Sequence, residues 1–208
     1  MQRLLIATHN RGKVSEYAEI LDGLPFELVT LDELGIRDDV QETGATLQEN
    51  ARLKALTYSA QSGLLALADD SGLEVDALGG APGVYSKRGG APGVYSKRYA
   101  GKGKSDADRN VYLLEKLSAV PRAERAARFR CVIVIADAQG HTWTSEGTCE
   151  GEIAFTARGT NGFGYDPIFI VRGDDRHLAE FSPQEKNAIS HRGRAAVGAR
   201  KILAQLAN

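Results

Sequence analysis

The amino-acid sequence predicts an α/β protein with a mixed β-sheet and flanking helices. In the first third of the 208 residues, short apolar segments alternate with segments whose apolar residues recur at helical spacing. Later in the chain, two strand-like segments adjoin across the turn Asp137-Ala138-Gln139-Gly140, a pattern typical of a β-hairpin. Alternating strands and helices favour parallel pairing and the hairpin adds an antiparallel pair, so a mixed sheet is expected.

Strands are expected where short apolar runs are bounded by polar or turn residues. The clearest is residues 64–68, which is apolar throughout and is expected to end at Asp69. The expected strands are residues 4–7, 26–30, 64–68, 129–136, 141–149 and 168–171.

Helices are expected where apolar residues share one face and a cap residue precedes them. Residues 13–21 show such a face, and Thr46 with Glu49 forms a capping-box pattern that begins a helix reaching about Ser62. Further helices are expected after Ser105, at Pro183 in the first helical position, and over residues 194–207. His191 and Arg192 are expected to lie outside the last two helices.

The length and composition fit a single domain, residues 1–208, with enough chain for two lobes that share a core. A formal net charge of -1 argues against binding nucleic acid by bulk electrostatics. No apolar run approaches the length of a membrane span. Cys131 and Cys149 lie in strand-like segments without zinc-ligand spacing, so a reduced, cytoplasmic protein is expected.

Residues 79–98 hold a tandem duplication. The ten residues GGAPGVYSKR at 79–88 recur without change at 89–98. A period of ten that occurs only twice is not a solenoid. A duplication, natural or engineered, that is absorbed on the surface is the favoured interpretation, since a longer surface loop adds little closure entropy. The alternative is that the second copy has a function.

Residues 8–13, Thr8-His9-Asn10-Arg11-Gly12-Lys13, lie between an expected strand end and an expected helix start. Backbone N–H groups are free at a helix start and the helix dipole favours an anion there, so this turn is a candidate phosphate site. Lys13 adds a positive charge, Thr8 and Asn10 add donors, and Gly12 permits close approach. The same residues also suit an ordinary strand–helix turn with an exposed lysine. A Walker motif is absent.

Asp69, Asp70 and Ser71 follow the most apolar expected strand. Two adjacent carboxylates are costly unless a cation or hydrogen-bond donors neutralise them, and hard oxygen ligands suit Mg²⁺. Glu42 offers a further carboxylate, and Lys54 on the following helix is either a surface lysine or a phosphate ligand. The alternative for the acidic pair is a common polar turn.

A third candidate cluster joins aromatic and charged residues near the end of the chain. Phe163 and Tyr165 flank a glycine and precede Asp166, and Lys186 and Arg192 follow on the C-terminal side. A slot for a purine base needs stacking faces and fixed polar groups at the edge, and these residues supply both. The alternative is that the aromatic residues belong to the core.

Taken in order, these segments resemble the inosine/xanthosine triphosphate pyrophosphatase family over essentially the whole chain. The matching motifs are T-H-N-R-G-K at 8–13, E-T-G at 42–44, E-N at 49–50, D-D-S-G-L at 69–73, G-G-A-P-G-V-Y-S at 79–86, F-G-Y-D-P at 163–167, E-K at 185–186 and S-H-R at 190–192. The resemblance implies an elongated mixed sheet, two lobes around a central active-site cleft, a homodimer and a need for Mg²⁺. It also implies cleavage of ITP, dITP or XTP between the α- and β-phosphates. The departure is the second copy of the repeat, because the family pattern has one.

The resemblance also implies roles for the candidate residues. Thr8, His9, Asn10, Arg11, Gly12 and Lys13 would hold phosphates. Glu42 and Asp70 would bind Mg²⁺, with Asp70 also as proton acceptor. Lys54 and Ser71 would contact the substrate. Phe163, Gly164, Tyr165, Asp166, Lys186, His191 and Arg192 would hold the base and sugar.

Selectivity for deaminated purines has a physical basis. An arginine offers only donors, so it pairs with the O6 acceptor of hypoxanthine or xanthine, whereas adenine presents an amino donor at that position. An unmatched buried polar group costs about 1–3 kcal/mol. The competing interpretations are a non-catalytic nucleotide-binding module and a general phosphatase without base preference.

Overall fold

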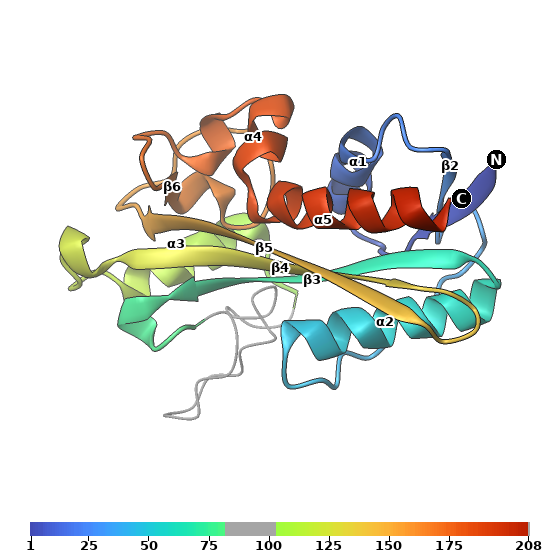
Figure 1. Ribbon diagram of the computed structural model, residues 1–208. Coiled ribbons are helices and arrows are strands. Elements are labelled where there is room, and N and C mark those ends of the chain that lie inside the picture. The colour runs from blue at the N-terminus through green and yellow to red at the C-terminus, as the bar shows by residue number, and fades with distance from the viewer. Residues whose placement is uncertain (82–102, 208) are drawn as a thin grey trace. The chain divides into compact units, whose positions relative to one another are not determined.

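The computed structural model describes residues 1–81 and 103–207 (Figure 1). The strands are β1 (Gln2–Ile6), β2 (Phe26–Thr30), β3 (Leu65–Val75), β4 (Ala126–Ala136), β5 (Thr142–Ile153) and β6 (Phe169–Val171). The α-helices are α1 (Arg11–Ile20), α2 (Leu47–Ser62), α3 (Asp106–Lys116), α4 (Pro183–Ile189) and α5 (His191–Leu206).

The strands form one sheet in the order β2-β1-β3-β4-β5-β6. β1 pairs in parallel with both β2 and β3, whereas β5 and β6 pair antiparallel. The mixed α/β fold expected from the sequence is therefore confirmed. The expected surface excursion of the repeat falls almost entirely on residues outside the described ranges.

The chain divides into two compact units. Unit 1 comprises residues 1–71, 131–147 and 191–208, and unit 2 comprises residues 72–130 and 148–190. The three long strands β3, β4 and β5 contribute residues to both units. Each unit has its own hydrophobic core.

The core of unit 1 lies between its part of the sheet and the helices α1 and α5. Leu4 and Ile6 of β1 point into it, as expected for alternate residues of a strand, and Tyr17 of α1 and Leu203 of α5 cover them. Helix α2 covers the opposite face of these strands (Figure 1). Side chains that alternate along a strand of unit 1 therefore meet different helices.

The core of unit 2 gathers residues from α3, β5 and β6 around Phe129 and Phe169, whose ring centroids lie 4.7 Å apart. A buried arginine closes one end of α3. The guanidinium of Arg125 donates to the carbonyl oxygens of Leu117, Val120 and Ala154 at 2.6, 3.0 and 2.8 Å. It thereby ties the carbonyl at the C-terminal end of α3 to two carbonyls outside the helix.

Two elements differ from the sequence-based prediction. β3 does not end before Asp69 but continues to Val75, so the acidic pair lies within a strand rather than in a turn. Its parallel pairing with β1 extends only to Leu67, opposite Ile6, and beyond that point β3 continues beside β4. Helix α5 begins at His191, not at residue 194, because only Ser190, with extended backbone angles, separates it from α4.

Candidate active site

The candidate residues form two clusters, one in each unit. The carboxylate cluster of unit 1 comprises Asp69, Asp70 and the side chains around them. The Phe163 turn of unit 2 comprises residues 162–166 and the side chains that hold it.

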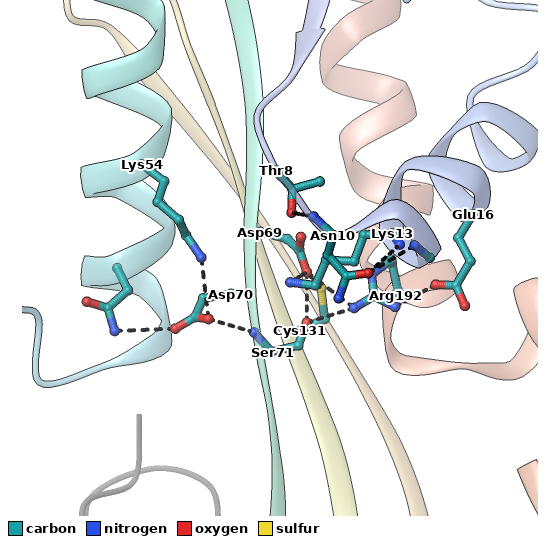
Figure 2. Close-up of polar contacts among 12 residues, drawn as sticks. Thr8, Asn10, Lys13, Glu16, Lys54, Asp69, Asp70, Ser71, Cys131 and Arg192 are labelled. Carbon is teal, nitrogen blue, oxygen red and sulfur yellow. Dashed lines mark hydrogen bonds and ion pairs between the residues drawn. The ribbon is translucent and has the colours of Figure 1, made fainter. Parts of the chain in front are cut away.

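Asp69 and Asp70 point to opposite sides of β3 (Figure 2). Successive residues of a strand face opposite sides of the sheet, so the two carboxylates are separated although they are adjacent in sequence. Both are buried, with 2% and 8% of their surfaces exposed. The strand therefore directs each carboxylate to its own partners.

Asp70 faces α2. Lys54 Nζ lies 3.5 Å from Asp70 Oδ1 and 2.8 Å from Glu42 Oε1, so one ammonium links both carboxylates. Asn50, fully buried on α2, donates from Nδ2 to Asp70 Oδ2 at 3.3 Å and accepts the N–H of Gly44 on Oδ1 at 2.8 Å. Asn50 therefore ties the loop that carries Glu42 to Asp70, a role that the sequence analysis did not assign.

Gly44 shows why this loop approaches α2 so closely. A Cβ at this position would lie 2.6 Å from Glu49 Cβ and 2.7 Å from Asn50 Oδ1, distances at which atoms clash. Glu49 is occupied by the predicted capping box, in which its carboxylate accepts the N–H of Thr46. The sequence motif E-T-G thus provides the carboxylate of Glu42 together with the glycine that lets it reach Lys54.

Asp69 faces α1 and α5 (Figure 2). Lys13 Nζ lies 2.9 Å and Arg192 Nη2 3.4 Å from its Oδ2, and Ser71 Oγ donates to the same oxygen at 2.8 Å. Arg192 also pairs with Glu16 at 2.5 Å and donates to Ser71 Oγ at 3.3 Å. Asp69 thus binds one residue from each of two sequence motifs, Lys13 of residues 8–13 and Arg192 of residues 190–192.

The electrostatics of the two carboxylates differ. Burial would raise the pKa of Asp69, but Lys13, Arg192 and Lys54 outweigh it and hold the pKa well below its ordinary value. For Asp70, burial is the larger effect and, with the nearby charge of Glu42, raises the pKa despite Lys54. Burial also raises the pKa of the Cys131 thiol, which lies 3.7 Å from Asp69 Oδ2, to about 12. Asp69 is therefore held as a carboxylate, whereas Asp70 has the higher proton affinity.

The turn before α1 uses its own polar groups to start the helix. Asn10 Oδ1 accepts the N–H groups of Gly12 and Lys13 at 2.9 and 3.3 Å, and Thr8 Oγ1 accepts the N–H of Asn10 at 3.2 Å. The expectation that these N–H groups are free for phosphate is therefore wrong, because Asn10 is the helix N-cap. His9 lies 3.8 Å from Asp32 and Asp39, and Arg11 is exposed.

The Phe163 turn is built around a buried ion pair. Lys186 Nζ lies 2.6 Å from Asp166 Oδ2, and both side chains are about 5% exposed. The same oxygen accepts the N–H of Phe163 at 2.9 Å, and the Lys186 ammonium lies 4.7 Å from the centroid of the half-buried Phe163 ring. Gly162, with φ of +75°, has no room for a Cβ, which would lie 2.1 Å from Asp166 Oδ2.

The remaining candidates of the predicted base site are distributed between the units. Tyr165 packs in the core of unit 2 and is 4% exposed, which agrees with the alternative interpretation for this aromatic residue. His191 and Arg192 are buried in the first turn of α5 and belong to unit 1. The structure thus brings Phe163, Asp166 and Lys186 together, and it brings Arg192 to Asp69.

Glu42 and Asp70, the residues predicted to bind metal, already share one cation. Glu42 and Asp70 converge on one cation, the Lys54 ammonium, so their oxygens already face a shared positive charge. Within residues 1–81 and 103–207, no group of three or more His, Cys, Asp or Glu side chains is arranged to hold a metal. Mg²⁺ typically takes one or two carboxylates and completes its shell with water and substrate phosphates, so the pair fits such an ion.

The fold and these clusters define a mixed α/β protein whose buried carboxylates are paired with lysine and arginine side chains. The chain matches the Ham1 family over residues 4–89 and again over residues 88–202, and it belongs to this family. The boundary between the two matches lies at the junction of the two copies of the repeat. This split agrees with a family pattern that has one copy.

Individual relatives extend over nearly the full chain. A dITP/XTP pyrophosphatase of Desulforamulus reducens is 47% identical and covers 98% of this chain and 96% of its own. One of Geobacter sulfurreducens is 48% identical, covering 94% and 93%. The solved structure of a HAM1 protein from Coxiella burnetii superimposes with a TM-score of 0.85, is 43% identical and covers 99% and 100%.

Among the helices of the described ranges, none combines the length and apolar character needed to cross a membrane.

Proposed function

We propose that this protein hydrolyses the deaminated purine nucleoside triphosphates ITP, dITP and XTP to a nucleoside monophosphate and pyrophosphate. The observation that carries the proposal is the separation of the two carboxylates on β3, one anchored by cations and one of raised proton affinity beside Glu42 and Lys54. The names and full-length similarity of the relatives give the substrate class.

In the proposed reaction, water attacks a phosphorus in line with the leaving pyrophosphate, and Asp70 accepts the proton of that water. Glu42 and Asp70 would hold Mg²⁺, which when bound neutralises phosphate charge and lowers the pKa of the attacking water. Lys54 and Lys13 bind phosphate oxygens, and each exchanges part of its present carboxylate contact for the substrate. Asp69 keeps Lys13 and Arg192 in place during this exchange.

The base is proposed to bind at the Phe163 turn. The Phe163 ring supplies a stacking face, and the buried Lys186 ammonium beside it is, like an arginine, a group with donors only. Such a group suits the O6 acceptor of hypoxanthine or xanthine and opposes the amino group of adenine. Because Lys186 is held beside the Phe163 ring by Asp166, within the same unit, it is the donor we favour for O6.

Product identity tests the proposal and separates it from its competitors. Purified protein with ITP and Mg²⁺ should yield IMP and pyrophosphate in equal amounts, measured by chromatography and a coupled pyrophosphate assay. Formation of IDP and phosphate would overturn the proposed cleavage position. Rapid hydrolysis of a simple phosphate ester would indicate a general phosphatase, and saturable binding of ITP without product would indicate a binding module.

We further propose a cytoplasmic homodimer, as the resemblance implies. Light scattering of the purified protein should give twice the mass of one 22.4 kDa chain. A single-chain mass at the concentrations that support full activity would contradict the dimer.

A further inference from the structure

We propose that Asp106, in the first turn of α3, is a positioning residue that fixes the direction of the Phe163 ring. Asp106 Oδ2 accepts the N–H of Gly164 at 2.8 Å, a contact between residues 58 positions apart in the sequence. Both residues belong to unit 2. The inference rests on the proposed function, because it assigns Phe163 to the base.

Two hydrogen bonds hold the peptide planes on either side of Phe163. The N–H of Phe163 belongs to the peptide plane before this residue, and the N–H of Gly164 belongs to the plane after it. Asp166 Oδ2 accepts the first at 2.9 Å, and Asp106 Oδ2 accepts the second at 2.8 Å. Because peptide planes are rigid, holding both of them restricts both backbone angles of Phe163 and therefore the direction of its side chain.

The two carboxylates are themselves held from different helices. Asp166 is paired with Lys186 of α4. Asp106 is paired through Oδ1 with Arg109, which is 8% exposed and also donates to the carbonyl of Lys104. Helix α3 is fixed in turn, because Leu113 and Leu117 lie in the core of unit 2. The turn is therefore clamped between two elements that do not move independently of that core.

The turn needs such a clamp because its backbone is intrinsically free. Gly162 and Gly164 flank Phe163 with φ of +75° and +64°, and glycine has the widest conformational freedom in the unfolded and mobile states. Without the Asp106 contact, the peptide plane after Phe163 loses this hydrogen bond. The Phe163 ring would then adopt orientations that do not stack on a base. Binding the base would have to order the ring, which lowers the affinity for the substrate.

The test compares Asp106→Ala and Asp106→Asn with Asp108→Ala as control. Asp108 lies in the same first turn and accepts from Ser105, the helix cap, and not from the turn. Asp106→Ala should raise KM for ITP about 3- to 30-fold with kcat little changed, since the turn loses one hydrogen bond to a charged acceptor and substrate binding must then order the Phe163 ring. Asp106→Asn keeps an acceptor and should stay within about twofold of the parent KM. Asp108→Ala should lower the melting temperature without raising KM.

Amide hydrogen exchange gives a second readout that does not depend on turnover. The peptide containing Gly164 should exchange faster in Asp106→Ala than in the parent and in Asp108→Ala. An unchanged KM and unchanged exchange in Asp106→Ala would overturn the inference. Equal losses in Asp106→Ala and Asp106→Asn would also overturn it, since they would trace the effect to the Arg109 pair. If the parent protein fails to cleave ITP, the proposed function fails, while the exchange data still decide the positioning of the turn.

Discussion

At the scale of single residues, the alternation of side chains along β3 decides the chemistry. Asp69 and Asp70 are neighbours in sequence, and the sequence leaves open whether a cation or hydrogen-bond donors neutralise them. Because the two side chains face opposite sides of the strand, Asp69 contacts Lys13 and Arg192, whereas Asp70 contacts Lys54 and Asn50. One carboxylate thus organises the cluster, and the other is the proposed base. The two should respond differently to the same substitution.

Asp69→Asn should unfold more easily than Asp70→Asn. Loss of the Asp69 charge leaves Lys13 and the buried Arg192 without their shared partner, and removing one member of a buried ion pair costs about 3–5 kcal/mol. Asp70 carries a raised pKa, so a neutral isostere should cost about 1 kcal/mol or less. Denaturant unfolding of both variants gives the comparison, and equal losses of stability would refute the separation of roles.

Asp70→Asn should instead abolish turnover. The amide cannot accept the proton of the attacking water, so kcat for ITP should fall at least about 100-fold, the usual size of a general-base contribution. Initial rates at saturating Mg²⁺ measure this, with circular dichroism as a check of the fold. Near-normal rates would remove Asp70 from the role of base.

Lys13→Ala should raise KM for ITP about tenfold, because hydrogen bonds to charged groups contribute about 1.5–3 kcal/mol. Lys201 of α5 is exposed and provides the matched control, since Lys201→Ala removes the same charge without touching Asp69. Both variants should be assayed at low ionic strength, where a weak contribution is not screened. If Lys201→Ala raises KM as much as Lys13→Ala, the effect is one of general charge and Lys13 has no specific role.

At the scale of elements, the sequence alone predicts the start of a helix where a cap residue or a first-turn proline specifies it. The capping box at Thr46, the helix cap at Ser105 and the proline at position 183 all stand where the sequence predicts them. The end of β3 and the start of α5 were not predictable in the same way. The carboxylates of Asp69 and Asp70 suggest a turn in the sequence. They are accommodated within a buried strand because cations from distant parts of the chain neutralise them. Likewise, His191 and Arg192 begin a helix because Ser190 alone suffices to break α4.

The C-terminal end of α3 offers a test at this scale. Arg125→Met keeps apolar volume but removes three hydrogen bonds to backbone carbonyls, and each buried acceptor left without a partner is costly. The free energy of unfolding should fall by about 2–4 kcal/mol. Arg122→Ala, which removes an exposed pair with Glu152, should leave stability nearly unchanged. Equal stability of the two variants in urea would show that Arg125 is not a structural cap.

At the scale of the whole molecule, the sequence predicts the α/β class and the ordered motifs, and the family match confirms the identification. The contacts of individual side chains within the protein were not predictable from the sequence. Asn10 caps α1, and Arg192 is bound by Glu16 and Asp69, while the proposed roles of both residues toward substrate stay predictions. Residue type gives the chemistry a side chain is capable of, whereas only the folded chain decides which partner it meets.

The repeat allows a prediction about the whole chain. Because the family match divides at the junction of the two copies, one copy is surplus to the family pattern. Deletion of residues 89–98 should therefore leave the melting temperature and the rate with ITP unchanged or slightly higher. Unfolding of the deletion variant would mean that the second copy has become part of the fold.

The central claim is selectivity for deaminated purines, and the ratio of kcat/KM for ITP to that for ATP tests it most directly. One mismatched buried polar contact costs about 1–3 kcal/mol, so the ratio should be roughly 5 to 150. Both substrates should be assayed with the same protein and Mg²⁺ concentration by pyrophosphate release. A ratio of about 5 or more is the predicted result, and equal values of kcat/KM for ITP and ATP would contradict the account.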